Sequence, residues 1–379
     1  MLYHELRLRF FDLEACIRSD SATHIDLLGR MYGRFRVDHS PSAVPYRLDA
    51  TLLTRPENPW RQPILIVDKD AWLLEDPRLL EGWVYDGILS RIIARVRSHL
   101  LIHAGVVSWE GQGVVLSGDA GHGKTTLVLE LVRRGFRFLS DEMAALGRAD
   151  RRVYPFPRSL RLRPDTLVRA GYGSLAPSTL MWMEKFLLDI EEIHPGSVGT
   201  AAAISYIVFL QDPAQTTEPA PRDPERELRI WVDRVDDELL SAIRQIDGVE
   251  DVSVEQAGAY RPIRIVARRR MAALVEIEAL CHQRRALILD VVGQSHRQPA
   301  FKGPARLEPL SKSEAVMELL HHFQGGPGSA LLREEFGRSA ARFYWEMTGL
   351  VAQATCYRLA VGPLEEMADL ICGLLPHDG

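Results

Sequence analysis

One short run of residues has the types and spacing of a loop that binds phosphate. Gly118–Thr125 reads Gly-Asp-Ala-Gly-His-Gly-Lys-Thr and fits G-x-x-x-x-G-K-[ST], a pattern whose successive backbone N–H groups surround the phosphates of a nucleotide. We expect the imidazole of His122 to point to solvent while its backbone lines the loop. The predicted nucleotide-binding residues are Gly118, Asp119, Ala120, Gly121, His122, Gly123, Lys124, Thr125 and Thr126.

The residues on either side of the loop predict the elements that position it. Gly113–Ser117 is a short apolar run of the kind that forms a buried strand. Downstream, a helix over 126–134 would place Leu127 and Leu131 on one face, and Gly135 is its stop signal. A strand, a glycine-rich turn and a helix N-terminus form an anion site from backbone dipoles. The sequence therefore predicts binding of a nucleoside triphosphate.

Three side chains near the loop could supply the chemistry of phosphoryl transfer. Lys124 would place a positive charge on the β- and γ-phosphates, and the Thr125 hydroxyl is a hard oxygen ligand of the type that Mg²⁺ prefers. Asp141 lies 17 residues after Lys124, a gap that one helix and one return strand fill. There its carboxylate could hold Mg²⁺ or accept a proton from an attacking hydroxyl. A gap this short is typical of kinases of small substrates rather than of motor or transporter ATPases.

Further candidates lie on neighbouring segments. His103 could face the phosphates from a strand that pairs with the loop's strand, or it could be a core residue. Arginine side chains on an extended, proline-rich segment could contact the transferring phosphate, or they could be a solvated edge. They are Arg158, Arg161 and Arg163. The adjacent pairs Cys281-His282 and His321-His322 lack the spacing of a zinc site.

Bulk composition limits the classes of partner. The net charge of -5 argues against a general affinity for nucleic acid, because such proteins need a basic surface. No run approaches the roughly 18 apolar residues of a membrane span, and the first residues do not resemble a signal peptide. The 4 cysteines show no CxxC spacing. We therefore expect a cytoplasmic protein without nucleic-acid or membrane partners, and a homo-oligomer stays possible.

The order of patterns along the chain predicts four parts. Residues 1–99 form a mixed α/β lobe that includes a helix over about 83–96, and residues 100–222 form the first part of a core. In that core, a single strand over 100–107 forms a hairpin with the strand before the loop. Residues 223–300 follow a βαββαβ order, the ferredoxin-like arrangement, and are interpreted as an inserted domain. Residues 301–379 would then complete the core.

Several of these motifs together resemble a known family. His103-Ala104-Gly105, the loop 118–125, and the run from Arg134-Gly135-Phe136 to Ser140-Asp141-Glu142 are similar to the catalytic core of HPr kinase/phosphorylase and its relatives. The resemblance implies a PEP-carboxykinase-like P-loop kinase core, in which a mixed sheet surrounds the loop. It also implies that His103 lies near the γ-phosphate, that Asp141 is the acid/base for a serine hydroxyl, and that Glu142 is a second, metal-associated carboxylate.

The resemblance weakens outside residues 100–165. Ile207–Leu210 and Cys356–Leu359 look like HPr-kinase-related proteins found near peptide-modification genes, among them kinases of ribosomally made peptides. The family's loop continues with Ser-Glu, whereas this chain has Thr125-Thr126. The chain also lacks a Glu-Ile-Arg-Gly-type signature of the phosphorylase reaction and carries the insertion at 223–300. HPr itself is therefore not the expected substrate, and dephosphorylation is not expected.

The sequence thus predicts an α/β enzyme that uses ATP and Mg²⁺ to phosphorylate a hydroxyl of a peptide or protein. Two other functions stay open. The first is a kinase of a hydroxylated metabolite, of the shikimate or gluconate type, which also has an aspartate soon after the loop. The second is a regulatory or scaffold protein that binds ATP and transfers nothing.

Overall fold

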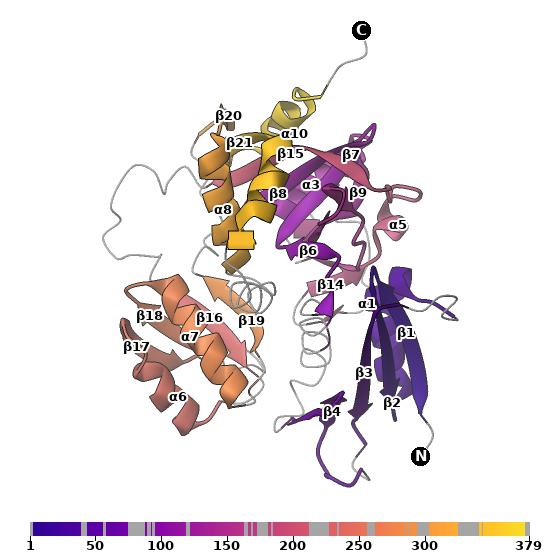
Figure 1. The fold of residues 1–379 in the computed structure, drawn as a ribbon, viewed down its shortest axis with the longest axis vertical. Coiled ribbons are helices and arrows are strands. Elements are labelled where there is room, and N and C mark those ends of the chain that lie inside the picture. The colour runs from indigo at the N-terminus through magenta and orange to yellow at the C-terminus, as the bar shows by residue number, and fades with distance from the viewer. Residues whose placement is uncertain are drawn as a thin grey trace. The chain divides into compact units, whose positions relative to one another are not determined.

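The computed structural model is a mixed α/β protein with several sheets (Figure 1). Its contacts divide it into two compact units, residues 1–97 with 220–294, and residues 98–219 with 295–379. Among the residues that it describes, no helix combines the length and the apolar character needed to cross a membrane. The structure describes residues 3–375 except 39–43, 56–57, 75–94 apart from 88 and 92, 119–121, 163–165, 168–169, 173–180, 183–184, 212–226, 233–234, 256–261, 285, 287, 294–302, 325–340 and 343.

The N-terminal part of the first unit is a five-stranded sheet with the order β1-β2-β3-β4-β5. Leucine and phenylalanine alternate with charged residues in β1, so that one face is apolar and α1 packs on it. Most of the helix expected over 83–96 lies outside the described residues. The elements are β1 (His4–Phe10), β2 (Leu13–Ser19), α1 (Ala22–Tyr32), η1 (Gly33–Phe35), β3 (Tyr46–Leu53), β4 (Ile64–Val67) and β5 (Asp70–Leu73).

Residues 227–293 form a four-stranded antiparallel sheet with two helices. The strand order is β17-β18-β16-β19, and the apolar side chains of the strands form a cluster with those of the helices. The assignment of this part as an inserted ferredoxin-like domain stays a prediction. Its elements are β16 (Glu227–Val232), α6 (Asp237–Arg244), β17 (Val249–Val254), β18 (Ile263–Ala267), α7 (Arg270–Gln283) and β19 (Ile288–Gly293).

A nine-stranded sheet is the centre of the second unit. Its order is β6-β10-β11-β15-β8-β7-β9, with β21 paired to β15 and β20 paired to β21. The pairs β8–β15 and β15–β21 are parallel, and the other described pairs are antiparallel. The strands are β6 (His99–Ile102), β7 (Ala104–Trp109), β8 (Gln112–Gly118), β9 (Arg137–Ser140), β10 (Ala144–Gly147), β11 (Arg152–Tyr154), β15 (Ala202–Gln211), β20 (Arg306–Pro309) and β21 (Thr355–Ala360).

Helices and a small sheet complete the second unit. The small sheet has the order β12-β14-β13, and β12 is one of its edges, which suits a proline-rich segment. Ser311 and Glu314 exchange hydrogen bonds at the start of α8, a capping box. The elements are α3 (Lys124–Arg133), β12 (Leu160–Leu162), β13 (Met181–Trp182), β14 (Lys185–Leu188), α5 (Ile190–Ile193), α8 (Lys312–Gln324) and α10 (Leu364–Cys372).

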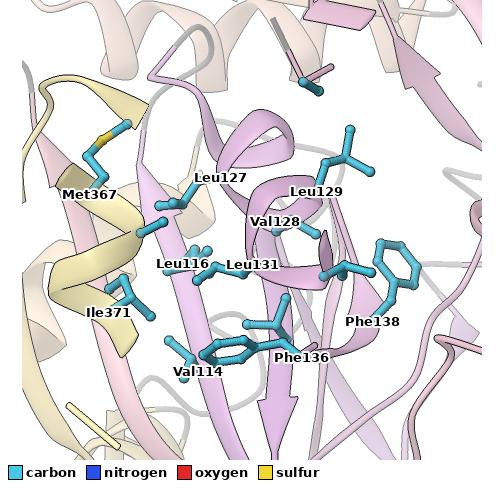
Figure 2. Close-up of a cluster of buried hydrophobic side chains, with 14 of the residues drawn as sticks. Val114, Leu116, Leu127, Val128, Leu129, Leu131, Phe136, Phe138, Met367 and Ile371 are labelled. Carbon is cyan, nitrogen blue, oxygen red and sulfur yellow. The ribbon is translucent and has the colours of Figure 1, made fainter. Parts of the chain in front are cut away.

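The alternation of side chains along β7 and β8 divides the core of this unit into two layers. Val107 and Val114 belong to the cluster that includes α3 and α10 (Figure 2). Val106 and Val115 belong to the cluster that includes α8 and the helical residues 347–351. Because successive residues of a strand face opposite sides of a sheet, helices cover both of its faces.

The hairpin between β7 and β8 forms as the sequence predicts, but the strand that leads into it is shorter than expected. The turn residues Glu110 and Gly111 both have positive φ, +47° and +78°, which suits the twist of paired strands. The single strand expected over 100–107 is instead two strands that meet at His103. The break occurs because the strands differ in their partners: β6 pairs with β10, whereas β7 pairs with β8 and β9.

Ion pairs join α3 to α10, the two helices that cover the same face of the sheet. The buried carboxylate of Glu130 accepts hydrogen bonds from Arg133 at 2.7 Å and from Arg134 at 2.6 Å. Arg134 also reaches Asp369 of α10 at 2.5 Å and contacts Glu365. Burial alone would raise the pKa of Glu130, but the hydrogen bonds from the two arginines outweigh it and lower the pKa below 4.5.

We predict that Glu130→Gln lowers the free energy of unfolding by about 1–3 kcal/mol at neutral pH, because the charged hydrogen bonds are lost. Because the pKa of Glu130 is lower in the folded protein than in the unfolded chain, its carboxylate stabilises the fold at pH values above the unfolded pKa. This stabilisation is lost as the pH falls through the pKa of the folded protein. The difference between variant and wild type should therefore shrink in acid. Denaturant unfolding at several pH values measures it.

The matched control is Glu318→Gln on α8. Glu318 is about one third exposed and makes one ion pair with Arg358 at 3.4 Å, so we expect a change below about 1 kcal/mol. Equal losses in the two variants, or a Glu130 loss that persists unchanged below pH 3, would contradict the role assigned to the cluster.

Candidate functional site

Three strand ends meet at one edge of the nine-stranded sheet. β8 ends at Gly118, the antiparallel β7 begins at Ala104, and β9, antiparallel to β7, ends at Ser140. The register pairs Ala104 with Ser117 of β8. On its other side, the Ala104 N–H donates to the Glu142 carbonyl oxygen at 3.2 Å. The loop's strand and the acidic pair therefore flank the same residue of β7.

This register brings His103 and Asp141 to the edge where the loop begins. His103 immediately precedes β7, and Asp141 immediately follows β9. Asp141 is buried, 3% exposed, and Ser140 Oγ accepts a hydrogen bond from the Met143 N–H at 3.0 Å, which closes the turn. A carboxylate at this edge can hold a metal ion or take a proton from a hydroxyl.

The described parts of the phosphate loop depend on two glycines. Gly118 has φ +152°, and a Cβ on it would lie 2.8 Å from the Leu210 carbonyl oxygen of β15. Gly123 has φ +85° and immediately precedes α3, and a Cβ there would meet no atom of the described residues within 4 Å. Residues 119–121 of the predicted loop lie outside the described residues.

The N-terminus of α3 is arranged to attract an anion. The first N–H groups of a helix have no intrahelical acceptor and carry the positive end of its dipole. The first turn of α3 contains no acidic residue, and its cap makes no side-chain hydrogen bond in the described part of the chain. The half-buried Thr125 and Thr126 lie in this turn. Phosphate can therefore approach these amides without opposing a carboxylate of the same turn.

Lys124 is folded back onto the loop. Its side chain is buried, and Nζ donates to the Gly118 carbonyl oxygen at 2.6 Å. A buried ammonium group needs such an acceptor. The ammonium group is therefore held at the start of the loop.

His122 does not point to solvent, so that expectation was wrong. The residue is 3% exposed, and Nδ1 lies 3.0 Å from the Leu210 carbonyl oxygen. The imidazole turns inward because the end of β15 offers a backbone acceptor beside the loop. Sequence patterns could not reveal this contact, since the two residues are 88 positions apart.

Arg158 lies at the same edge and forms an ion pair with Glu142. The Phe156 N–H donates to the Leu139 carbonyl oxygen at 2.8 Å and so attaches the proline-rich segment to β9. Arg158 is buried and forms an ion pair with the Glu142 carboxylate, which is 25% exposed. A carboxylate that a guanidinium already neutralises attracts a metal ion less strongly than a lone one.

The remaining predicted residues are less informative. Arg161 is half-buried in β12, opposite Leu187 of β14, and Arg163 lies outside the described residues. Among the residues that the structure describes, no three His, Cys, Asp or Glu side chains form a cluster that could hold a metal ion.

We expect Gly118→Ala to lower the free energy of unfolding by about 2–3 kcal/mol, because its methyl group would collide with the β15 backbone. Gly123→Ala is the matched control. It has open space but a left-handed backbone, so a loss of about 1 kcal/mol is expected. Denaturant unfolding of the two variants measures the difference, and a larger loss in Gly123→Ala would contradict the close approach of β8 and β15.

A double-mutant cycle should reveal the ion pair between Arg158 and Glu142. Arg158→Met leaves a largely buried carboxylate without its guanidinium, and we expect a loss of about 2–4 kcal/mol of stability. Glu142→Gln in the same chain should recover part of it, with a coupling energy of about 1–3 kcal/mol. Strictly additive losses in denaturant unfolding would show that the two side chains do not stabilise each other.

Part of the chain is similar in sequence to curated HPr kinase/phosphorylases. The chain is 31% identical over 144 residues to an HPr kinase/phosphorylase of Limosilactobacillus reuteri (strain DSM 20016), covering 34% of this chain and 45% of that protein. It is 30% identical over 115 residues to an HPr kinase/phosphorylase of Latilactobacillus sakei subsp. sakei (strain 23K), covering 30% of this chain and 32% of that protein. The chain thus spans less than half the length of these curated relatives.

The other comparisons add little. A solved structure of the Hpr(Ser) kinase/phosphatase from Coxiella burnetii is similar, with 17% sequence identity and a TM-score of 0.22, covering 49% of this chain and 95% of that one. No family model matches the chain. Over about a third of its length, the chain is therefore similar in sequence to HPr kinase/phosphorylases.

Proposed function

We propose that the chain is a phosphotransferase that uses ATP and Mg²⁺ to phosphorylate a hydroxyl group, with serine of a peptide or protein as the acceptor. The observation that carries the proposal is the meeting of strand ends at one sheet edge. There β8 ends at Gly118, where the predicted phosphate loop begins, while His103 precedes β7 and Asp141 follows β9.

The loop and the first turn of α3 fit the phosphates of ATP. Among the described residues, a Cβ on Gly123 would meet no atom within 4 Å, which suits a phosphate beside the amides of the first turn. Lys124 already holds its ammonium group within the loop. In the nucleotide complex, the ammonium group would donate to a phosphate oxygen. A charged acceptor of this kind forms a stronger hydrogen bond than a carbonyl oxygen does.

The oxygen ligands at the edge fit Mg²⁺. The Thr125 hydroxyl, Asp141 and Glu142 offer hard oxygen atoms, which this ion prefers together with water. When bound, Mg²⁺ neutralises charge on the β- and γ-phosphates. Since Arg158 pairs with Glu142, we assign the larger share of metal binding to Thr125 and keep Asp141 for the acceptor hydroxyl.

Asp141 is the proposed base. Phosphoryl transfer depends mainly on positioning and on stabilising charge, so the acceptor hydroxyl must be held in line and must lose a proton. Asp141 is buried at the strand end, where a carboxylate can accept that proton within a largely dry site. His103, at the start of β7, would lie beside the transferring phosphate. The relatives are HPr kinase/phosphorylases, but the departures of this chain from the family's signatures favour a different polypeptide.

We expect wild-type protein, incubated with γ-labelled ATP, Mg²⁺ and an extract of its host, to label a peptide or protein. Asp141→Asn should reduce the label about 100-fold or more while ATP affinity changes less than about threefold, because the base acts on the hydroxyl rather than on the nucleotide. Lys124→Ala should lose both the transferred label and the affinity for ATP. Gel autoradiography and calorimetry are the two measurements.

Asp150→Asn is the matched control, because this carboxylate lies in the turn between β10 and β11 and bonds to Tyr154 at 2.5 Å. It should label normally. Label on a small metabolite would instead identify a metabolite kinase. Tight binding of ATP with no transfer would favour a regulatory protein, and full activity in Asp141→Asn would remove that residue from the mechanism.

A further inference from the structure

We propose that His122 is a positioning residue that holds the phosphate loop against the end of β15 through the carbonyl group of Leu210. The inference rests on the proposed function, because it assigns a role within the same nucleotide site. It concerns a side chain that the loop pattern leaves unspecified, since any residue type can occupy this position of G-x-x-x-x-G-K-[ST].

The Leu210 carbonyl group lies where β8 ends. Leu210 pairs with Gly118, the last residue of β8, and its oxygen lies 2.8 Å from the position that a Cβ on Gly118 would occupy. The oxygen is therefore directed at the end of β8. His122 Nδ1 lies 3.0 Å from this oxygen, so that the imidazole ties the residue before Gly123 to β15.

The contact also determines which nitrogen of the ring carries hydrogen. A carbonyl oxygen only accepts, so Nδ1 must be the donor and must carry the proton. Nε2 is buried and has no hydrogen-bond partner among the residues that the structure describes. A neutral imidazole in this tautomer has no hydrogen on Nε2 and therefore leaves no buried donor unsatisfied.

Among the residues that the structure describes, two side-chain bonds hold the loop, and only one of them involves a group that is expected to bind phosphate. Lys124 Nζ bonds to the Gly118 carbonyl oxygen, and its ammonium group, which has three N–H donors, would also bond to a phosphate. The bond from His122 joins the loop to Leu210 of the sheet. His122 therefore holds the loop through a bond that takes no part in phosphate binding.

A hydrogen bond that orients the loop stabilises the bound nucleotide equally in the ground state and in the transition state of transfer. Its loss should weaken binding and leave the rate of the bound complex nearly unchanged, which is the signature of uniform binding. A catalytic role for the imidazole would instead reduce the rate at saturating ATP.

The test compares His122→Leu, which removes the donor, with His122→Asn, whose amide nitrogen can replace Nδ1. Calorimetry with Mg-ATP should show a dissociation constant about five- to tenfold higher for His122→Leu, the effect of one neutral hydrogen bond. His122→Asn should recover most of this loss. The rate at saturating ATP should change less than about twofold in either variant.

The matched control is His99→Leu. His99 is also a buried histidine, on β6, and its Nδ1 lies 2.8 Å from Ser98 Oγ. Its loss should lower the melting temperature without changing the affinity for Mg-ATP. Equal affinity of His122→Leu and wild type, or no recovery in His122→Asn, would overturn the proposal.

A second measurement separates this proposal from the proposed function. In unliganded wild-type protein with ¹⁵N-labelled histidine, the ring signals assigned through His122→Asn should show hydrogen on Nδ1. Hydrogen on Nε2 would overturn the bond to Leu210. If wild type did not bind Mg-ATP, the proposed function would fail, and this spectrum alone would still decide whether His122 holds the loop.

Discussion

The parallel pairing of β8 with β15 is the constraint on which the rest of the site depends. Two glycines of β8 lie close to the β15 backbone: a Cβ on Gly113 or on Gly118 would lie 2.8 Å from a carbonyl oxygen of β15. Larger residues would separate the strands at these two points. The pairing fixes where β8 ends, and hence where α3 begins and where its amides point.

A second close approach aligns α3 with the other side of the site. A Cβ on Gly105 in β7 would lie 2.7 Å from the Val128 side chain of α3, so the helix rests directly on this strand. Because β7 also pairs with β9, the register carries the end of β9, and with it Asp141, to the edge beside the helix N-terminus. The ion pairs of Glu130 and Arg134 then attach α3 to α10. The positions of loop, helix and carboxylate are thus consequences of backbone packing.

Local patterns predicted the parts of the site that are local. The strand before the predicted loop, the helix after it and the β7–β8 turn each follow from a short run of residues. Contacts between distant segments could not be predicted from one sequence. The burial of His122 depends on a β15 carbonyl far along the chain, and the break at His103 depends on which strands pair. The ion pair of Arg158 with Glu142 depends on how the proline-rich segment attaches to β9.

Hydrogen exchange with and without Mg-ATP tests the central claim most directly, which is that the edge around Gly118 and the start of α3 binds the triphosphate. The account predicts slower exchange of the amides of residues 122–127, with smaller effects around Glu142, and no such change in Lys124→Ala. Protection that appears elsewhere and spares the first turn of α3, or equal protection in Lys124→Ala, would contradict it.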